Sequence, residues 1–203
     1  IRSSLRPDLR LLVMSATLDP GPIAEFLGGC PIIRAEGRTY PVAIEYLGAN
    51  QRAPLSERVV QGVECALRAR SPSGGTVSPG DCLVFLPGVE EIRRAARSLQ
   101  PLAADLSLEI LPLHASLAVE DQRKALAPAA FGRRKVVLAT NVAETSLTID
   151  GVTAVIDTGL ARIAAVDPAR GLDTLHLRRI SQASADQRAG RAGRTAAGLC
   201  LRL

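Results

Sequence analysis

The sequence predicts a doubly wound α/β fold, in which a mostly parallel sheet is covered by helices on both faces. Short apolar runs of strand length alternate with longer segments of helical periodicity along most of the 203 residues. Such alternation implies parallel strands joined by right-handed crossovers. With 47% hydrophobic residues, the chain is long and apolar enough for one large core or two small ones.

The first 34 residues predict three short elements. Residues 9–14 and 31–34 have the pattern of buried strands, and residues 22–27 that of a short helix between them. A larger strand and helix alternation follows. Its predicted strands are residues 42–46, 81–86, 108–113, 135–139 and 152–157, and its predicted helices are residues 55–70, 89–99 and 119–131.

Two further segments interrupt this alternation. Residues 71–80 contain Pro and Gly at high density and predict a surface loop. Residues 160–167 and 172–179 predict two strands joined by Asp167-Pro168-Ala169-Arg170-Gly171, which is a sequence of strong turn formers. A β-hairpin is therefore expected before the last part of the chain.

Composition narrows the classes of partner. Aromatic residues are only 2% of the chain, which excludes a platform of stacked aromatic rings for nucleic-acid bases. The net charge is +5, and residues 133–203 carry all of this excess, with 11 basic and 6 acidic side chains. Any nucleic acid should thus be contacted through its backbone.

The cysteine pattern indicates a protein of a reducing compartment, and the hydropathy pattern indicates no membrane span. Cys30, Cys65, Cys82 and Cys200 form no CxxC pair and show no metal-ligand spacing with a histidine. No run approaches the roughly 18 apolar residues of a membrane span, and no signal-peptide pattern opens the chain. We expect a cytoplasmic protein that has no membrane partner and binds no metal through these residues.

The arginine-rich segment at residues 187–194 is a candidate phosphate site. On a helix, Gln187, Arg191 and Arg194 fall at i, i+4 and i+7, so that one amide and two guanidinium groups face the same way. A guanidinium fork matches phosphate oxygens and cannot be deprotonated. The alternative is a solvated surface helix. Gly190 and Gly193 speak against it, because glycine weakens a helix and is better explained by close backbone approach to a ligand.

Polar residues also follow the predicted strand at residues 135–139. Thr140 and Asn141 lie where ligands collect in open α/β sheets, beyond the carboxyl end of a strand, and their side chains can donate to a phosphate. The alternative is that both residues cap a turn, although capping explains single residues better than a matched run.

Residues 139–150 and 187–194 together resemble motifs V and VI of superfamily 2 helicases in the DEAH-box form, and most closely the bacterial HrpB-like branch. Residues 83–92 resemble motif IV, a strand followed by the start of a helix, and Ser15-Ala16-Thr17 resemble motif III. The resemblance covers essentially the whole chain. It implies a RecA-like fold with an inserted β-hairpin.

The resemblance also implies roles for individual residues. Gln187, Arg191 and Arg194 would be catalytic and bind the nucleotide, with Arg191 and Arg194 as arginine fingers; Thr148 and Asp150 would complete the nucleotide site. Gly88, Ser116, Thr140 and Asn141 would bind RNA, and Ser15, Ala16 and Thr17 would couple nucleotide state to domain motion. These residues lie at the positions that match the family motifs.

Ser116, Arg188 and the hairpin each keep two interpretations, and the two histidines are given a structural one. Serine before a helix is often a cap, so Ser116 is as readily explained that way as by RNA contact. Arg188 lies off the main face and is equally well explained as a surface or interdomain ion-pair residue. His114 and His176 have no partner evident in the sequence and are taken as structural histidines. The hairpin is either a wedge at a strand junction or an edge ribbon.

By the same resemblance, residues 1–38 are the tail of a first RecA-like domain, and residues 39–203 are a second RecA-like domain, truncated at its C-terminal end. The chain contains neither a GxxxxGK[ST] loop nor a DEAH box. We therefore expect ATP, or another nucleoside triphosphate, to be held with Mg²⁺ mainly by the missing first domain. The full protein would be an ATP-dependent RNA helicase, and this fragment alone inactive. The alternatives are a non-catalytic module that binds RNA or a partner, and a DNA helicase.

Overall fold

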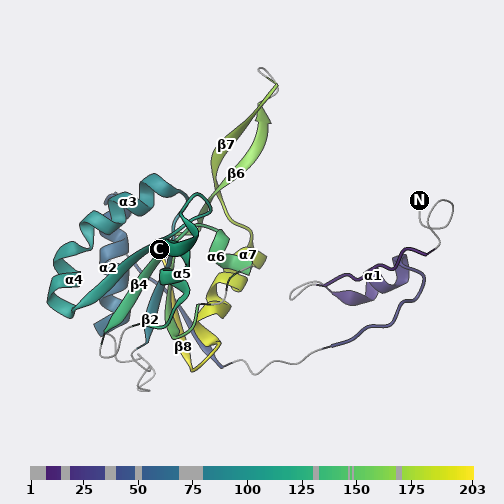
Figure 1. The fold of residues 1–203 in the computed structure, drawn as a ribbon, viewed down its shortest axis with the longest axis horizontal. Helices are drawn as coiled ribbons and strands as arrows, with labels where there is room; N and C mark the ends of the chain where they lie inside the picture. The colour runs from purple at the N-terminus through teal and green to yellow at the C-terminus, as the bar shows by residue number, and fades with distance from the viewer. Residues whose placement is uncertain are drawn as a thin grey trace. The chain divides into compact units, whose positions relative to one another are not determined.

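The computed structural model describes residues 8–14, 19–34, 40–48, 52–68, 80–129, 133–145, 147, 149–167 and 171–203 (Figure 1). By its internal contacts the chain divides into two compact units, Ile1–Gly37 and Arg38–Leu203. The division falls close to the predicted domain boundary at residue 38.

The first unit contains one helix, α1 (Pro20–Phe26), among its described residues. Asp19 caps it by accepting a hydrogen bond from the Gly21 amide at 3.1 Å. Residues 9–14 and 31–34 form no strand, so the prediction of two strands is wrong for this unit. Their side chains are largely exposed, as at Leu12 (80%) and Ile33 (91%). An extended segment becomes a strand only when a neighbouring strand pairs with its backbone groups.

The second unit is built on a six-stranded parallel sheet with the strand order β1-β8-β5-β2-β4-β3. Its strands are β1 (Val42–Tyr46), β2 (Asp81–Phe85), β3 (Leu108–Leu113), β4 (Arg134–Ala139), β5 (Val152–Asp157) and β8 (Gly198–Arg202). All residues of β2 and β5 are buried, as expected for central strands covered on both faces. The predicted doubly wound α/β fold is confirmed.

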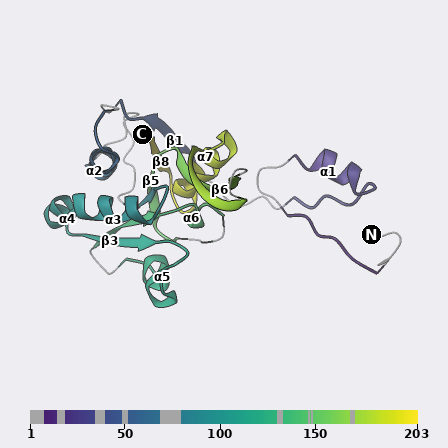
Figure 2. The same ribbon diagram turned by 90° about the horizontal axis from the view of Figure 1, so that it is seen from above.

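Helices cover both faces of this sheet (Figure 2). One face packs against α2 (Leu55–Arg68), α3 (Val89–Ser98) and α4 (Gln100–Leu106). The other packs against α5 (Val119–Leu126), α6 (Val142–Thr145), α7 (Gln182–Ala189) and the 3₁₀ turn η1 (Gly190–Gly193). Alternate residues of β2 serve the two cores: Cys82 and Val84 face the first, and Leu83 and Phe85 the second.

The predicted β-hairpin is present and stands off the body of the second unit (Figure 1). It consists of β6 (Leu160–Asp167) and β7 (Leu172–Arg179), paired antiparallel from Leu160 opposite Arg179. At its root, the Ile180 amide donates to the Gly159 carbonyl at 3.0 Å. Arg162 of β6 also forms an ion pair with Glu91 of α3 at 2.8 Å, which ties the hairpin to the body. Residues 168–170 of the turn and residues 71–79 of the predicted loop lie outside the described residues.

Among the described residues, the helices are too short and too polar for any of them to span a bilayer.

Candidate functional site

Most residues predicted to form the site lie beyond the ends of the parallel strands. The side on which these strands end is called here the carboxyl edge of the sheet, and the side on which they begin is called the amino edge. Three positions follow the carboxyl ends of neighbouring strands: Gly88 follows β2, Ser116 follows β3, and Thr140 with Asn141 follows β4. In contrast, Asp150 precedes β5 and Arg194 precedes β8, so both lie toward the amino edge. The sheet therefore separates the predicted RNA contacts from Asp150 and Arg194.

Thr140 and Asn141 form a turn that the backbone closes by itself. The Thr140 amide donates to the Leu113 carbonyl at 3.2 Å, and the carbonyls of Thr140 and Asn141 accept the amides of Ala143 and Glu144. Within the described part of the chain, none of the side-chain hydrogen bonds involves the Thr140 hydroxyl or the Asn141 amide group. The side chains are thus not needed as caps, and that of Asn141 is exposed at the sheet edge.

Gly88 has a different environment from the one expected. It is buried at the N-cap of α3, and a Cβ atom placed there would lie 2.7 Å from Arg162 Nε and 2.8 Å from Glu91 Oε2. The side chains of the Arg162–Glu91 ion pair therefore occupy the space that was expected to be open for an RNA backbone. The contact of Gly88 with RNA stays a prediction without this support.

Ser116 is exposed and is not a helix cap. The helix that follows, α5, begins after Ala118, which makes no side-chain cap hydrogen bond. The Ser116 hydroxyl instead lies 3.0 Å from His114 Nδ1, so the predicted capping alternative is wrong and His114 has a partner. His176 likewise lies 2.7 Å from the Thr174 hydroxyl on the hairpin.

The arginine-rich segment does not form one continuous α-helix. The α-helix α7 ends at Ala189, and residues Gly190–Gly193 continue as a 3₁₀ turn, which rotates each residue by a larger angle. Gln187 is half-buried, Arg191 is buried and Arg194 is exposed. The expectation that all three share one open face holds only if the helix continues beyond Ala189, which it does not.

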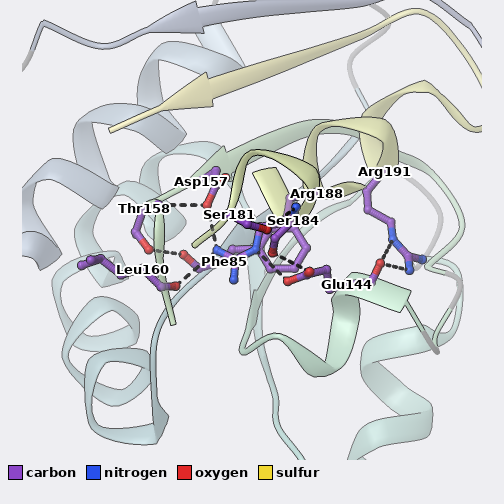
Figure 3. Close-up of polar contacts among 10 residues, drawn as sticks. Phe85, Glu144, Asp157, Thr158, Leu160, Ser181, Ser184, Arg188 and Arg191 are labelled. Carbon is purple, nitrogen blue, oxygen red and sulfur yellow. Dashed lines mark hydrogen bonds and ion pairs between the residues drawn. The ribbon is translucent and has the colours of Figure 1, made fainter. Parts of the chain in front are cut away.

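Arg191 binds backbone carbonyls of α6 and of the segment that follows it. Its Nε donates to the Glu144 carbonyl at 3.0 Å, and its Nη atoms donate to the carbonyls of Glu144 and Leu147 (Figure 3). Burial, together with the nearby positive charge of Arg194, lowers the pKa of Arg191 to about 10, while the negative charge of Glu144 acts in the opposite direction. Arg191 is still a cation at neutral pH, in a place where its charge is poorly compensated.

Arg188 is fully buried, and neither the surface nor the interdomain interpretation applies. Its Nη1 forms an ion pair with Asp157 at 2.8 Å, and its Nε forms one with Glu144 at 3.1 Å. The guanidinium also lies over the Phe85 ring, 4.7 Å from the centroid, and Nη1 donates to the Leu160 carbonyl at 3.3 Å (Figure 3). Arg188 thus connects the ends of β2 and β5, the helix α6 and the root of the hairpin.

The two glycines of the arginine-rich segment, Gly190 and Gly193, have different surroundings. A Cβ atom on Gly193 would lie 2.5 Å from the Tyr40 carbonyl oxygen, and the Tyr40 amide donates to the Gly193 carbonyl at 2.8 Å. Close approach of the chain before β1, and not of a ligand, therefore explains Gly193. At Gly190 nothing lies within 4 Å of such a Cβ atom, so the space beside this residue is open.

A polar cavity of about 600 Å³ lies at the carboxyl ends of β1, β5 and β8, beside the root of the hairpin. Arg58, Arg179 and Arg202 line it together with Asp157. The cavity therefore carries three guanidinium groups and one carboxylate at the carboxyl edge, away from the positions that the motifs predicted. No motif in the sequence indicated this cavity.

Two groups of predicted residues lie outside the described part of the chain. They are Thr148, predicted to approach the nucleotide, and the coupling residues Ser15, Ala16 and Thr17.

The parallel sheet, the inserted hairpin and the arginine-rich segment together define a RecA-like helicase domain. The model of the helicase conserved C-terminal domain matches residues 70–196. The chain is 44% identical over its full length to the ATP-dependent RNA helicase HrpB of Escherichia coli, and 43% identical over 98% of its length to the pre-mRNA-splicing factor ATP-dependent RNA helicase prp22 of Schizosaccharomyces pombe. Two crystal structures of Escherichia coli HrpB, described as a DExH-box NTPase and as a DEAH/RHA helicase, superpose on the whole chain with TM-scores of 0.85 and 0.84.

The chain belongs to the helicase conserved C-terminal domain family. Its similarity over the whole chain to HrpB and prp22 agrees with the predicted DEAH-box resemblance. The predicted family is confirmed. The chain spans only about a quarter of the HrpB sequence and structures, at 24–25%, and 17% of the prp22 sequence.

Proposed function

We propose that this chain is the motor half of an ATP-dependent RNA helicase, in which nucleoside triphosphate hydrolysis drives movement along RNA. One observation carries the proposal. In a chain of the DEAH-box family, side chains suited to an RNA backbone stand at one edge of the sheet, and the arginine-rich segment extends toward the other.

On the nucleotide side, Gln187, Arg191, Arg194 and Asp150 would contact the nucleoside triphosphate, together with Thr148. A polyphosphate fits this place because Arg191 is a buried cation with a second cation beside it, so an anion would relieve an unfavourable charge. The open space beside Gly190 would also admit a ligand or a neighbouring domain. ATP supplies the phosphoryl group that is transferred, and the first RecA-like domain would hold it with Mg²⁺.

On the RNA side, Thr140, Asn141 and Ser116 would hold the sugar-phosphate backbone from the ends of β4 and β3. The side chains of Thr140 and Asn141 are not used as caps, and Ser116 is exposed. Contacts of this kind carry no sequence information, so binding should have low sequence specificity and weaken as salt is raised.

The proposed cycle links these two sides. Arg191 and Arg194 would stabilise the charge that develops on the γ-phosphate, and loss of that charge after hydrolysis would let the two RecA-like domains separate. Alternating grip through Thr140 and Asn141 would then give directional movement. Ser15, Ala16 and Thr17 would couple the nucleotide to this motion, and the hairpin would act as a wedge at the strand junction.

Duplex unwinding by the full-length protein tests this function. We expect ATP-dependent unwinding of a tailed RNA duplex that exceeds unwinding of a DNA duplex of the same sequence. A strict preference for DNA would make the protein a DNA helicase instead. Tight RNA binding without any hydrolysis of ATP would favour the non-catalytic RNA-binding module.

A further inference from the structure

The carboxyl edge of the sheet, where Asn141 lies, and the amino edge, toward which Arg194 lies, are on opposite sides of this domain. The strand β5 has six residues, so at about 3.3 Å per residue the carboxyl and amino edges of the sheet are about 20 Å apart. Within the described residues, the layer formed by α6, α7 and η1 covers the face of the sheet that lies between these places.

Glu144 is the residue of this layer that contacts both sides. Its amide donates to the Asn141 carbonyl at 2.9 Å, so it is part of the predicted RNA-binding turn. Its own carbonyl accepts a hydrogen bond from Arg191 Nε at 3.0 Å. Its carboxylate accepts hydrogen bonds from Ser184 Oγ and Arg188 Nε (Figure 3). The position of Glu144 thus sets the position of the carbonyl that orients Arg191.

Arg188 fixes the side chain of Glu144 to the rigid part of the domain. The Arg188 side chain is 1% exposed, and its second ion pair is with Asp157, whose side chain is also 1% exposed. The Phe85 ring under the guanidinium leaves Arg188 little freedom to move. Arg188 is a single cation shared by two carboxylates, and different nitrogens of its planar guanidinium fork bond each of them.

We propose that Glu144 and Arg188 are positioning residues, which fix the RNA-binding turn and the Arg191 guanidinium in one geometry and thereby let RNA stimulate hydrolysis. This inference rests on the proposed function. A buried ion pair that only stabilised the fold would not affect the stimulation of hydrolysis by RNA. Neither residue contacts RNA or nucleotide itself in this account.

The test is the variant Glu144→Gln in the full-length protein, because glutamine keeps the size of the side chain and removes its charge. We expect kcat for RNA-stimulated ATP hydrolysis to fall by about 10²-fold, the loss typical of a misplaced catalytic group. The KM for ATP and the Kd for single-stranded RNA should change by less than about 3-fold, because no binding contact is removed.

The matched control is Asp81→Asn. Asp81 and Lys135 form a second buried ion pair of the same sheet, at 3.8 Å with side chains 7% and 1% exposed, but at the start of β2 and β4 and away from α6. This variant should lower the melting temperature about as much as Glu144→Gln and leave kcat near the wild-type value. If Glu144→Gln also keeps its kcat, the pair is structural only and the inference is overturned.

Two further variants keep the inference falsifiable if Glu144→Gln does not fold. Ser184→Ala removes one hydrogen bond from the Glu144 carboxylate and should lower kcat in the same direction, by less. Arg188→Lys and Ser184→Ala should combine non-additively, since both loosen Glu144, whereas additive effects would overturn the inference. A wild-type protein whose hydrolysis does not respond to RNA would overturn the proposed function itself. Stimulated hydrolysis that survives in all these variants would overturn only the positioning role.

Discussion

The three arginines of the 187–194 segment have three different environments. Arg188 is buried in ion pairs, Arg191 is buried against backbone carbonyls, and Arg194 is exposed. The helical spacing of Gln187, Arg191 and Arg194 indicated one shared face, and the change to a 3₁₀ turn at Gly190 alters that arrangement. Their chemical roles therefore follow from burial more than from spacing.

Lysine substitutions should separate the roles of two of these arginines. Arg194→Lys should lower kcat for ATP hydrolysis by about 10³- to 10⁵-fold, the range measured for arginine fingers, with a smaller loss of stability than Arg191→Lys because Arg194 is exposed. Arg191→Lys should lower kcat and also cost about 2–4 kcal/mol of unfolding free energy, because its hydrogen bonds to the Glu144 and Leu147 carbonyls are lost. Hydrolysis assays and denaturant unfolding of the two variants measure both effects. Near-normal hydrolysis by Arg194→Lys would exclude it as a finger.

The thiols should differ sharply in reactivity. Burial raises the pKa of Cys82 and of Cys200 to about 12, so both remain protonated at pH 8 and water does not reach them. Cys65 is exposed on α2. With an aromatic disulfide reagent at pH 8, Cys65 should react in the native protein, and Cys82 and Cys200 only after unfolding. Rapid native labelling of Cys82 would mean that the central strand β2 opens readily.

At the scale of elements, the sequence predicts the positions of most strands. It does not predict which segments find a partner strand. The bounds of β3, β5, β6 and β7 agree with the predicted ranges, because apolar runs and turn residues mark these strands locally. Two helices were missed: α6 is only four residues long, and α4 follows α3 with one residue between them. The predicted strands 9–14 and 31–34 failed because strand formation depends on a partner that a local pattern does not reveal.

The candidate site was predictable to a similar degree. The positions of Thr140 and Asn141 at a strand end follow from the chain order of strands and helices, and the structure has them there. The partner of Arg188 could not be inferred, since Asp157 and Glu144 lie 31 and 44 residues away in sequence. Long-range contacts also explain Gly88 and Gly193, where Arg162 and Tyr40 fill the space that sequence reasoning assigned to ligands.

Alanine substitutions at the two glycines of η1 should have opposite effects on stability. Gly193→Ala places a methyl group against the Tyr40 carbonyl and should cost about 1–3 kcal/mol. Gly190→Ala meets open space in a helical conformation and should stabilise the protein by up to about 1 kcal/mol. Chemical unfolding measures both. Equal effects of the two changes would contradict the contact between η1 and the chain before β1.

At the scale of the whole molecule, the central strands are among the most deeply buried parts of the described chain. The strands β2, β4 and β5 lie inside the sheet and are almost completely buried, whereas the side chains of residues 9–14 are exposed and form no strand. In hydrogen exchange, amides of these three strands should exchange slowest and those of residues 9–14 fastest. Strong protection of residues 9–14 would mean that this segment pairs with another strand in solution.

The proposed motor needs a structural connection between the predicted RNA-binding turn and the predicted nucleotide site, and the second unit provides one. The sheet fixes the strand ends that carry Thr140 and Asn141, and the layer of α6, α7 and η1 runs across one of its faces toward Arg194. A rigid sheet with a helical layer is suited to transmit a small displacement, because packed interiors deform little. The buried pair of Glu144 and Arg188 lies within that layer.

The measurement that tests the account most directly is the rate of ATP hydrolysis by the full-length protein, with and without single-stranded RNA, at several salt concentrations. The account predicts hydrolysis that RNA stimulates, with a stimulation that requires more RNA as salt is raised, because the contacts are to phosphates. A rate that does not change when RNA is added, at low salt and saturating ATP, would contradict the central claim that this domain links RNA binding to hydrolysis.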